Sequence, residues 1–325
     1  MILPDRTAVS DFAGPFQKGS FEIVPLQKDL SKRTYFALVS SSHPRLILCI
    51  HQDPQDSAIG DFGSIGAFLA AGGIRVPSLL AVDRSRGWTL QSDAGSRDAG
   101  SLTGSASLAP LYDALIDIIV RMQGLQAKGP VSERSFDAVK LKLEISFFQE
   151  QFALAGKPLG LSDIPFEFNM FLLSVCEKLG EPGDWVFVHR DLHSRNVMLN
   201  DQDEPVLIDF QDARMGLPWY DLASLVYDPY LDLGREERER LVRRYLEKSR
   251  RGPGRNLLYL QALQRTVKAI GTYLSVLASS RSPFYLDALK QAFAYLEEIV
   301  QLGGFPDHGF VFANEGRIAL GKLAW

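Results

Sequence analysis

The sequence predicts an α+β protein with two lobes, a small N-terminal lobe rich in β-strands (residues 1–93) and a larger, mainly helical C-terminal lobe (residues 94–325). Short apolar runs bounded by turn residues dominate up to Asp93, whereas amphipathic segments with helical spacing dominate from Leu108 onward. The Gly- and Ser-rich stretch that begins at residue 94 is typical of a loop leaving a hinge. A chain of 325 residues is long enough for two hydrophobic cores.

The N-terminal lobe is expected to contain a small sheet and one helix. The expected strands are residues 21–26, 35–39, 45–50, 76–82 and 88–90. Residues 65–71 have helical spacing and precede the pair Gly72-Gly73, which is a typical helix stop.

The C-terminal lobe is expected to be helical apart from one short β-rich stretch. The expected helices are residues 108–125, 136–154, 166–179, 236–248, 256–277 and 283–302. Residues 186–188 form an apolar run typical of a buried strand, and residues 197–199 and 206–208 are two more. The polar segment 200–204 between the last two predicts a hairpin.

The composition excludes several classes of protein. The hydrophobic content of 46% and the charged content of 23% are ordinary for a soluble globular protein. A net charge of −4 without a basic block argues against nucleic acid as a partner. No apolar stretch has the length of a signal peptide or a membrane span, so we expect a cytoplasmic protein with no membrane partner. Cys49 and Cys176 lie far apart in apolar surroundings and are expected to be buried free thiols.

The chemistry is concentrated in the segment HRDLHSRN (189–196) and the IDF that follows the hairpin. Asp191 is placed to orient a hydroxyl nucleophile and to accept its proton, while Asn196 and Asp209 are placed to hold Mg²⁺ against the phosphates of a nucleotide. Each of these residues alone would be an ordinary polar loop residue. Their combination at this spacing predicts a phosphotransferase.

HRDLHSRN followed by LIDFQDA resembles the catalytic core of the aminoglycoside phosphotransferase and choline kinase families, which are relatives of protein kinases. The resemblance implies the bilobal protein-kinase-like fold, ATP and Mg²⁺ as cofactors, and a nucleotide near a hinge that contains Gln91 and Asp93. It also implies that Asp221, in the segment YDLAS, braces the catalytic loop, although simple N-capping is an alternative. We expect His189 to fix the same loop by hydrogen bonding.

Two parts that kinase-like folds usually carry are missing: the first hairpin, 28–36, has no glycine, and strand 46–52 has no lysine. In this the chain is similar to the kinases of N-acetylmuramate and N-acetylglucosamine, which have a first hairpin of the form S-x-R-x-Y-F. The segments Leu263-Gln264-Arg265, Lys268 and Gly271 extend the resemblance. At the hairpin tip, Lys32 and Arg33 are candidates for binding the β- and γ-phosphates, with a solvated basic turn as the alternative.

That resemblance implies phosphoryl transfer to the anomeric hydroxyl of an N-acetylated amino sugar. The candidate residues for contacts with the sugar are Glu144, Phe148, Arg195 and Asp212. The alternatives are an exposed helix residue for Glu144 and a surface ion pair for Arg195. The resemblance further implies a place in cell-wall recycling and a possible downstream nucleotidyltransferase as a functional partner.

Three other functions stay open. The acceptor could be choline, ethanolamine or an aminoglycoside, since Trp219, Tyr220 and Asp228 leave room for the acidic or aromatic cage that a cation requires. The chain could be a non-catalytic nucleotide-binding regulator, against which the complete set of proposed base and metal ligands argues. It could be a protein kinase, but no APE-like segment follows Asp209.

Overall fold

The computed structural model describes residues 3–26, 33–102, 105–250 and 254–323. The chain divides into two compact units, of which the first contains Met1–Asp98 and Asn196–Asp212 and the second contains Ala99–Arg195 and Ala213–Trp325. The first unit carries a small antiparallel sheet and the second is mainly helical, which confirms the predicted α+β class. The assignment of nucleotide binding to residues 1–93 and of catalysis and acceptor binding to residues 94–325 stays a prediction.

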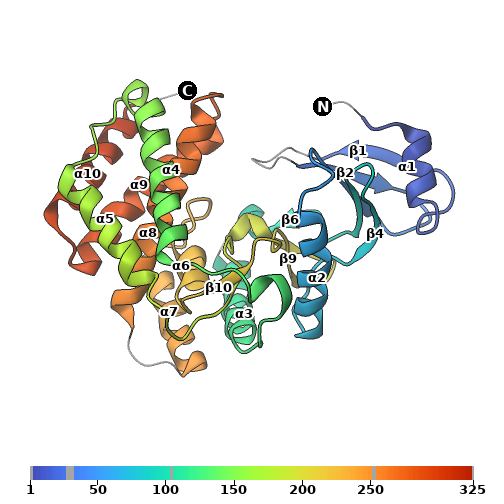
Figure 1. Ribbon diagram of the computed structural model, residues 1–325, viewed down its shortest axis with the longest axis horizontal. Coiled ribbons are helices and arrows are strands. Elements are labelled where there is room, and N and C mark those ends of the chain that lie inside the picture. The colour runs from blue at the N-terminus through green and yellow to red at the C-terminus, as the bar shows by residue number, and fades with distance from the viewer. Residues whose placement is uncertain (1–2, 27–32, 103–104, 251–253, 324–325) are drawn as a thin grey trace. The chain divides into compact units, whose positions relative to one another are not determined.

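The sheet of the first unit has five strands in the order β1-β2-β3-β5-β4, with every neighbouring pair antiparallel. Its strands are β1 (Glu22–Pro25), β2 (Arg33–Val39), β3 (Leu46–His51), β4 (Leu79–Asp83) and β5 (Trp88–Ser92). All five were expected from the sequence. Helix α1 (Arg6–Ala13), which was not expected, lies beside this sheet (Figure 1).

Helix α2 (Ala58–Ala71) begins seven residues before the predicted start at residue 65. Its first half contains Gly60 and Gly63, which lower helix propensity and hid the element in the sequence. A Cβ on Gly63 would lie 2.8 Å from the Leu79 side chain, so this glycine permits the close packing of α2 against β4.

The two faces of the sheet differ in chemistry because residues directly opposite one another share a face. One face is apolar and is built from Phe36, Leu48 and Leu90, which are part of a buried cluster that includes Val9 of α1. The other face carries polar side chains. In the strand register, Arg33 lies opposite His51, Tyr35 opposite Cys49, and Cys49 opposite Thr89. Gln91 lies on the same face, opposite the apolar Ile47.

The predicted hairpin is present as β8 (Val197–Leu199) and β9 (Pro205–Leu207), and it pairs with β6 (Arg97–Asp98). Just before β6, Gly95 has φ 117°, and a Cβ there would lie 1.9 Å from the Leu199 carbonyl oxygen, so only glycine fits. Just after β9, the ring of Phe210 stacks on Phe62 of α2 with centroids 4.9 Å apart. These contacts fix the hairpin within the first unit.

Within its described residues, the second unit contains the six predicted helices together with α6 and α10. The helices are α3 (Ser105–Gln123), α4 (Ala138–Ala155), α5 (Phe166–Leu179), α6 (Tyr220–Val226), α7 (Arg235–Ser249), α8 (Arg255–Leu277), α9 (Pro283–Gly303) and α10 (Asp307–Gly321). Helix α10 was not expected, since Gly309 and Gly316 weaken its pattern. Cβ atoms at these glycines would lie 2.9 Å from the Phe168 ring and 2.2 Å from the Phe293 ring, so both permit close packing of α10.

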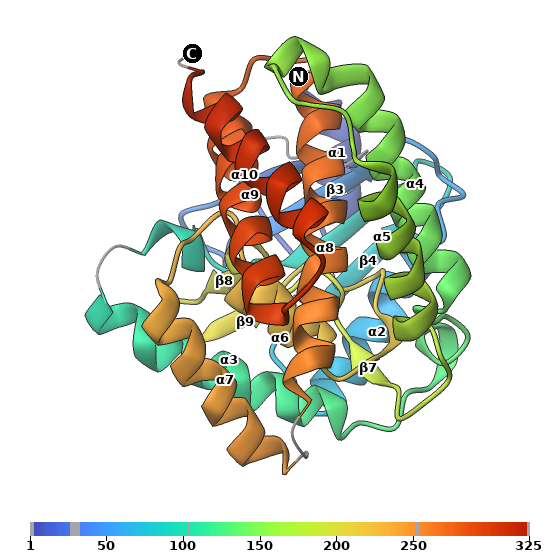
Figure 2. The same cartoon turned by 90° about the vertical axis from the view of Figure 1, so that its left-hand side faces the viewer.

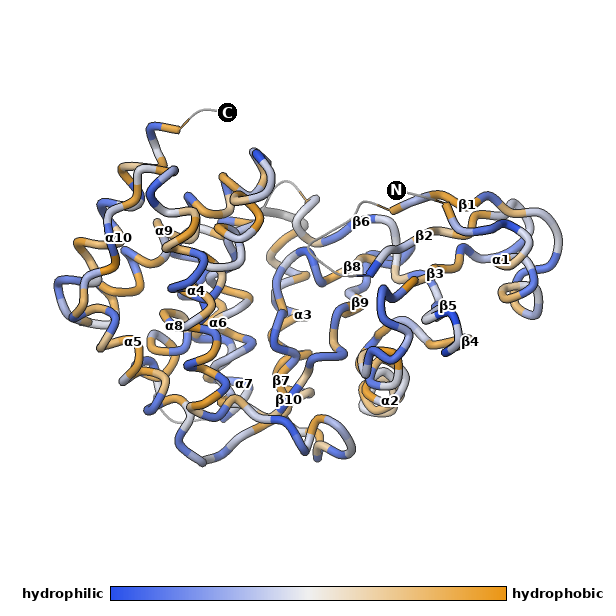
Figure 3. The backbone as a smooth tube through the Cα atoms, turned by 45° about the horizontal axis from the view of Figure 1, so that its top comes forward, coloured by the Kyte–Doolittle hydropathy of each residue, from blue (hydrophilic) through white to orange (hydrophobic). Residues whose placement is uncertain are grey.

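Helix α8 is the central element of the second unit, since it packs against α4, α5, α6 and α9 (Figure 2). Along α9 and α10 hydrophobic and hydrophilic residues alternate, as expected for helices with one buried face (Figure 3). The approach of α8 to α4 is close, because a Cβ on Gly271 would lie 2.7 Å from the Phe148 Cα. No helix in the described part of the chain is long and apolar enough to cross a membrane.

The predicted strand at residues 186–188 is β7 (Val186–Val188), which is fully apolar and buried. It pairs antiparallel with β10 (Arg214–Gly216), and Val188 lies opposite Arg214. Because β7 ends directly before HRD, its buried side chains fix the point at which the chemically important loop begins.

Candidate active site

The loop that follows β7 is fixed by two buried carboxylates of the second unit. Asp221 in α6 accepts hydrogen bonds from the backbone N–H groups of His189 and Arg190, at 2.7 and 3.0 Å. Asp228 accepts from the backbone N–H of Ser194 at 2.7 Å and from that of Tyr230 at 2.9 Å. Both carboxylates are fully buried, and burial raises the pKa of Asp221 and raises that of Asp228 to about 6. The loop is therefore held through its backbone N–H groups by carboxylates that lie outside it.

The backbone of Arg190 has φ 84°, in the region that non-glycine residues rarely occupy. Its carbonyl oxygen accepts a hydrogen bond of 2.6 Å from Nη1 of Arg265 in α8, while its N–H is bonded to Asp221. Contacts on both sides of the residue maintain this conformation, which costs about 1 kcal/mol or more.

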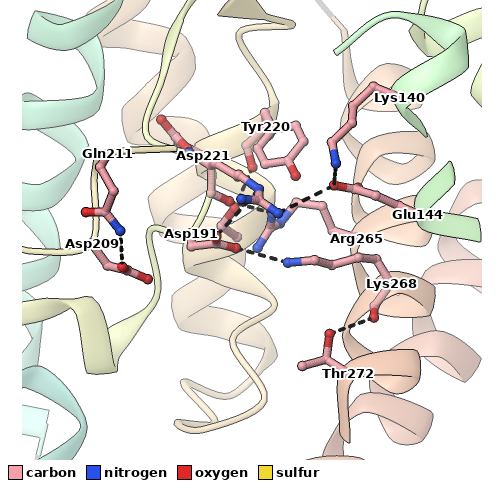
Figure 4. A network of polar contacts seen from close by, with 12 residues as sticks. Lys140, Glu144, Asp191, Asp209, Gln211, Tyr220, Asp221, Arg265, Lys268 and Thr272 are labelled. Carbon is pink, nitrogen blue, oxygen red and sulfur yellow. Dashed lines mark hydrogen bonds and ion pairs between the residues drawn. The ribbon is translucent and has the colours of Figure 1, made fainter. Parts of the chain in front are cut away.

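Asp191 lies between cationic side chains (Figure 4). Nζ of Lys268 is 3.1 Å from Oδ1 of Asp191, and Nε of Arg190 is 3.6 Å from Oδ2. Burial alone would raise the pKa of Asp191, but Lys268, Arg190 and Arg265 together hold this pKa well below its ordinary value. The carboxylate is ionised throughout the physiological pH range and is placed to accept a hydrogen bond from a hydroxyl group.

Glu144 in α4 is buried, with 6% of its surface exposed, so it is not an exposed helix residue. Its Oε2 accepts from Nε2 of Gln264 at 3.0 Å, and its Oε1 lies 3.7 Å from Lys140 and 3.9 Å from Arg190. Glu144 therefore compensates the buried charge of Arg190, which in turn contacts Asp191.

Phe148 has no exposed surface, and its ring lies 5.5 Å from that of Phe152 in an edge-to-face contact. Its backbone is packed against Gly271 of α8. Because this burial leaves no surface for a ligand, we remove Phe148 from the candidates for sugar contact. The sequence could not indicate the burial, since it results from the packing of one helix on another.

Two further loop residues have environments that the sequence did not indicate. The guanidinium of Arg195 lies over the rings of Phe284 and Tyr230, 4.8 and 5.7 Å from their centroids, so it is supported by aromatic rings. Burial lowers the pKa of His193 to about 3, so this imidazole is neutral at physiological pH. The side chain of His189 is fully buried, and among the described residues neither ring nitrogen has a hydrogen-bond partner, so the expected side-chain hydrogen bond is not found. His189 contributes to the loop through its backbone N–H, which is bonded to Asp221.

In the first unit, Asn196 and Asp209 lie at the two ends of the hairpin. The backbone carbonyl of Asn196 accepts from the N–H of Ile208 at 3.0 Å, which extends the β8–β9 pairing to the residue before Asp209. Asp209 has φ 63°, a left-handed conformation that redirects the chain at this point. Its Oδ1 accepts from Nε2 of Gln211 at 2.6 Å and from Nη2 of Arg33 at 3.2 Å.

Asn196 and Asp209 fit a magnesium ion better than they fit a metal ion whose ligands are all protein groups. Among the described residues, no cluster of three or more His, Cys, Asp or Glu side chains is suited to a metal. Mg²⁺ commonly takes one or two protein oxygens and completes its octahedron with water and phosphate oxygens. Asn196 and Asp209 supply two oxygens of that kind.

Of the other predicted nucleotide residues, Gln91 lies on the polar face of the sheet and Asp93 directly follows its strand, β5. Nε2 of Gln91 donates to Thr89 Oγ1 at 3.1 Å, and Asp93 lies 3.4 Å from Arg45. Asp212 is exposed. Lys32 lies outside the described residues. Of the two candidate cations, Arg33 is therefore the one whose surroundings are described, and it forms an ion pair with Asp209.

Sequence reasoning missed the contributions of Asp228 and of α8. A signal was present for α8, because Gln261, Gln264, Arg265 and Lys268 recur with helical spacing in an otherwise apolar helix. Polar residues on a buried face require partners, and here the partners include the proposed base. For Asp228, the signal was weaker, since one acidic residue between a tyrosine and a proline is typical of a turn.

Residues 22–257 match the protein family described as "Phosphotransferase enzyme family". The chain belongs to this phosphotransferase family. It is accordingly an enzyme, and the resemblance of its motifs to this family is confirmed.

Two known proteins are similar to this chain along most of its length. The N-acetylmuramate/N-acetylglucosamine kinase of Pseudomonas aeruginosa is 26% identical over 291 residues, which cover 86% of this chain and 84% of that protein. The protein of the same name from Neisseria meningitidis is 27% identical over 246 residues, which cover 72% of this chain and 70% of that protein.

Solved structures of the phosphotransferase family and of choline kinases share the fold. A choline kinase from Streptococcus pneumoniae matches with a TM-score of 0.64 at 13% identity, over 90% of this chain and 98% of that one. A thermostable mutant of an aminoglycoside phosphotransferase matches with a TM-score of 0.64 at 14% identity, over 92% and 99% of the two chains. These matches confirm the predicted protein-kinase-like fold.

Proposed function

We propose that this phosphotransferase is a Mg-ATP-dependent kinase that transfers the γ-phosphoryl group to the anomeric hydroxyl of N-acetylmuramate or N-acetylglucosamine. The observation that carries the proposal is the cationic environment of Asp191, formed by Lys268 at 3.1 Å and Arg190 at 3.6 Å. A hydroxyl next to this carboxylate is also next to positive charge, which favours neutral or anionic acceptors. The relatives named for N-acetylmuramate and N-acetylglucosamine agree with this choice.

Asp191 orients the acceptor hydroxyl and takes its proton. Since cationic neighbours hold its pKa well below the ordinary value, Asp191 is a weak base, and its main contribution is to position the hydroxyl oxygen. Proton transfer to Asp191 is completed only as the oxygen forms its bond to phosphorus, when the hydroxyl becomes strongly acidic.

On the nucleotide side, Asn196 and Asp209 would hold Mg²⁺, which neutralises charge on the phosphates when bound. Arg33 lies 3.2 Å from Asp209, so a phosphate near this carboxylate's metal would also be near the guanidinium. Arg33 thereby replaces the strand lysine that this chain lacks, and Lys32 is proposed to assist it. Gln91 and Asp93 are proposed to lie next to the base of the nucleotide.

On the acceptor side, Arg195 and Asp212 stay candidates for sugar contacts, whereas Glu144 acts through Arg190. The geometry argues against choline, ethanolamine or an aminoglycoside. Tyr220 is fully buried beneath the Arg265 guanidinium, which lies 4.6 Å from its ring centroid. Asp228 is bonded to two backbone N–H groups, so neither residue is available for a cage around a cation.

The deciding experiment is ATP consumption with Mg²⁺ against a panel of N-acetylmuramate, N-acetylglucosamine, glucosamine, choline and kanamycin. We expect turnover with the N-acetyl sugars and a sugar 1-phosphate by phosphorus NMR. Asp191→Ala should abolish turnover, whereas Asp184→Ala, at an exposed aspartate of the same unit, should leave it unchanged. Turnover with choline or kanamycin alone would refute the proposed acceptor.

A sugar 1-phosphate is the type of product that a nucleotidyltransferase consumes. Addition of such an enzyme with its nucleoside triphosphate should convert the product to a nucleotide sugar, which tests the proposed downstream partner. A product that carries phosphate on any other hydroxyl would not react, and this outcome would move the proposal to a different position on the sugar.

A further inference from the structure

Lys268 lies directly beside the proposed base, Asp191. Its Nζ lies 3.1 Å from Oδ1 of Asp191, and about one fifth of each side chain is exposed, 19% in both cases. The pair is therefore neither a solvated surface ion pair nor a sealed buried one. Lys268 is on α8, and the packing of this helix against α4, α6 and α9 fixes its position.

A hydroxyl that gives its proton to Asp191 must lie about 2.6–3.2 Å from the carboxylate oxygen. An oxygen at that distance from Oδ1 can also contact an ammonium group that is itself 3.1 Å from Oδ1, provided that both lie on the same side of the carboxylate. The same holds for an oxygen of the phosphoryl group while it bonds to the hydroxyl. Substrate oxygens at the reaction centre thus lie within reach of Lys268.

The other positive groups around Asp191 are committed to the protein. Nη1 of Arg265 donates to the Arg190 carbonyl at 2.6 Å, and Arg190 contacts both Glu144 and Asp191. His193, on the loop itself, is a neutral imidazole. By contrast, the only partner of the Lys268 ammonium among the described residues is Asp191, and an ammonium group has three N–H donors.

We propose that Lys268 is a catalytic residue whose ammonium group contacts the oxygens of the phosphoryl group in transit and the attacking hydroxyl. The proposal rests on the function proposed above. In the step, the acceptor oxygen forms a bond to the γ-phosphorus while the bond from that phosphorus to the bridging oxygen of ADP breaks. The hydroxyl proton goes to the Asp191 carboxylate, and ADP takes the electron pair of the broken bond. Lys268 stays protonated and stabilises the negative charge that spreads over the phosphoryl oxygens.

This role predicts an effect on the chemical step rather than on nucleotide binding. Removal of a single preorganised donor from a reaction centre typically lowers kcat by about 10²–10³-fold. Lys268→Met should show such a loss, with a Kd for Mg-ATP within about twofold of the wild-type value. Lys268→Arg keeps the charge and should retain at least about tenfold more activity than Lys268→Met.

The matched control is Lys142→Met, which removes a lysine from α4 that forms a surface ion pair with Glu177. It should leave kcat unchanged. If Lys268→Met does not fold, because Asp191 loses its partner, Lys268→Gln takes its place, since it keeps a hydrogen-bond donor next to Asp191 but removes the charge. Lys268→Arg should then exceed Lys268→Gln in kcat by at least about tenfold.

Two outcomes would overturn the role of Lys268. The first is a kcat of Lys268→Met within about twofold of wild type; the second is a loss explained by a raised Kd for Mg-ATP. If no sugar is phosphorylated, the proposed function fails but the role of Lys268 is still measured. Slow ATP hydrolysis, in which water takes the place of the hydroxyl, should then be lowered in Lys268→Met and not in Lys142→Met, and equal rates would refute the role.

Discussion

Asp221 holds the backbone of Arg190 in a left-handed conformation immediately before the proposed base. Oδ1 of Asp221 accepts from the Arg190 N–H at 3.0 Å, and the φ of Arg190 is 84°. The direction in which Asp191 leaves the chain is therefore set by a residue 31 positions after Arg190 in the sequence. Since Asp221 is fully buried, water cannot replace it as a hydrogen-bond acceptor.

Asp221→Asn should lower kcat by more than about tenfold and destabilise the fold by about 2 kcal/mol. An amide has one acceptor oxygen and a donor group, so one of the two backbone N–H groups would face an N–H₂ group. Steady-state kinetics and urea unfolding would measure both effects. Asp113→Asn, which removes a half-exposed ion-pair partner of Arg240, is the control and should change neither quantity appreciably. Wild-type kcat in Asp221→Asn would disprove the bracing role.

Backbone strain at Arg190 can be separated from the role of its side chain. Arg190→Gly and Arg190→Ala both remove the contacts with Glu144 and Asp191, but only glycine adopts a φ of 84° without strain. Arg190→Gly should therefore be more stable than Arg190→Ala by about 1 kcal/mol in urea unfolding. The opposite order would show that the flexibility of glycine outweighs the strain.

Arg33→Ala should raise the KM for ATP by about tenfold or more, with a smaller effect on the KM for the sugar. The expected cause is the loss of a cation 3.2 Å from the carboxylate that is proposed to hold the metal. Arg75→Ala removes another arginine of the first unit, one that forms an exposed ion pair with Glu204. This control should stay within twofold of wild type, and equal behaviour of the two variants would exclude Arg33 from nucleotide binding.

His193 and Asp228 are expected to give opposite contributions to stability as the pH changes. Burial lowers the pKa of His193 from 6.5 to about 3, so its contribution is complete above pH 6.5 and is lost as the pH falls toward 3. Burial raises the pKa of Asp228 from 3.8 to about 6, so its contribution is complete below pH 3.8 and is lost as the pH rises through 6.

Urea unfolding between pH 4 and 7 separates the two groups. His193→Gln should lose less stability than wild type on acidification from pH 6.5 to 4, whereas Asp228→Asn should lose more. Each difference has a slope of at most about 1.4 kcal/mol per pH unit. Parallel curves for wild type and both variants would contradict the assignment.

Local sequence patterns predicted the elements whose residues carry strong and unbroken periodicity. The apolar run in β3 and the amphipathic pattern of α8 are of this kind. Elements that contain glycine, such as the first half of α2 and all of α10, escaped prediction. Their glycines reduce helix propensity but allow close contact with residues far away in the sequence, and a local pattern contains no information about such contacts.

The candidate site shows the same division. Asp191, Asn196 and Asp209 could be proposed from the sequence because their chemistry is compressed into one segment of the chain, and their roles stay predictions. The environment of Asp191 could not, since Lys268 comes from a helix 77 residues later and Glu144 acts through Arg190. Phe148 was proposed to contact the sugar but is buried in the core, because the helical pattern of an aromatic residue does not distinguish a ligand contact from core packing.

Gly271 lies one helical turn beyond Lys268, where α8 meets the backbone of Phe148. A methyl group at this position would lie 2.7 Å from the Phe148 Cα and would push the two helices apart. The ammonium group beside Asp191 would then shift, although no charged or hydrogen-bonding atom had been altered. The electrostatics of the site thus depend on the absence of a single carbon atom, and a wholly apolar substitution at a residue with no reacting group of its own becomes a means of changing the rate of the reaction.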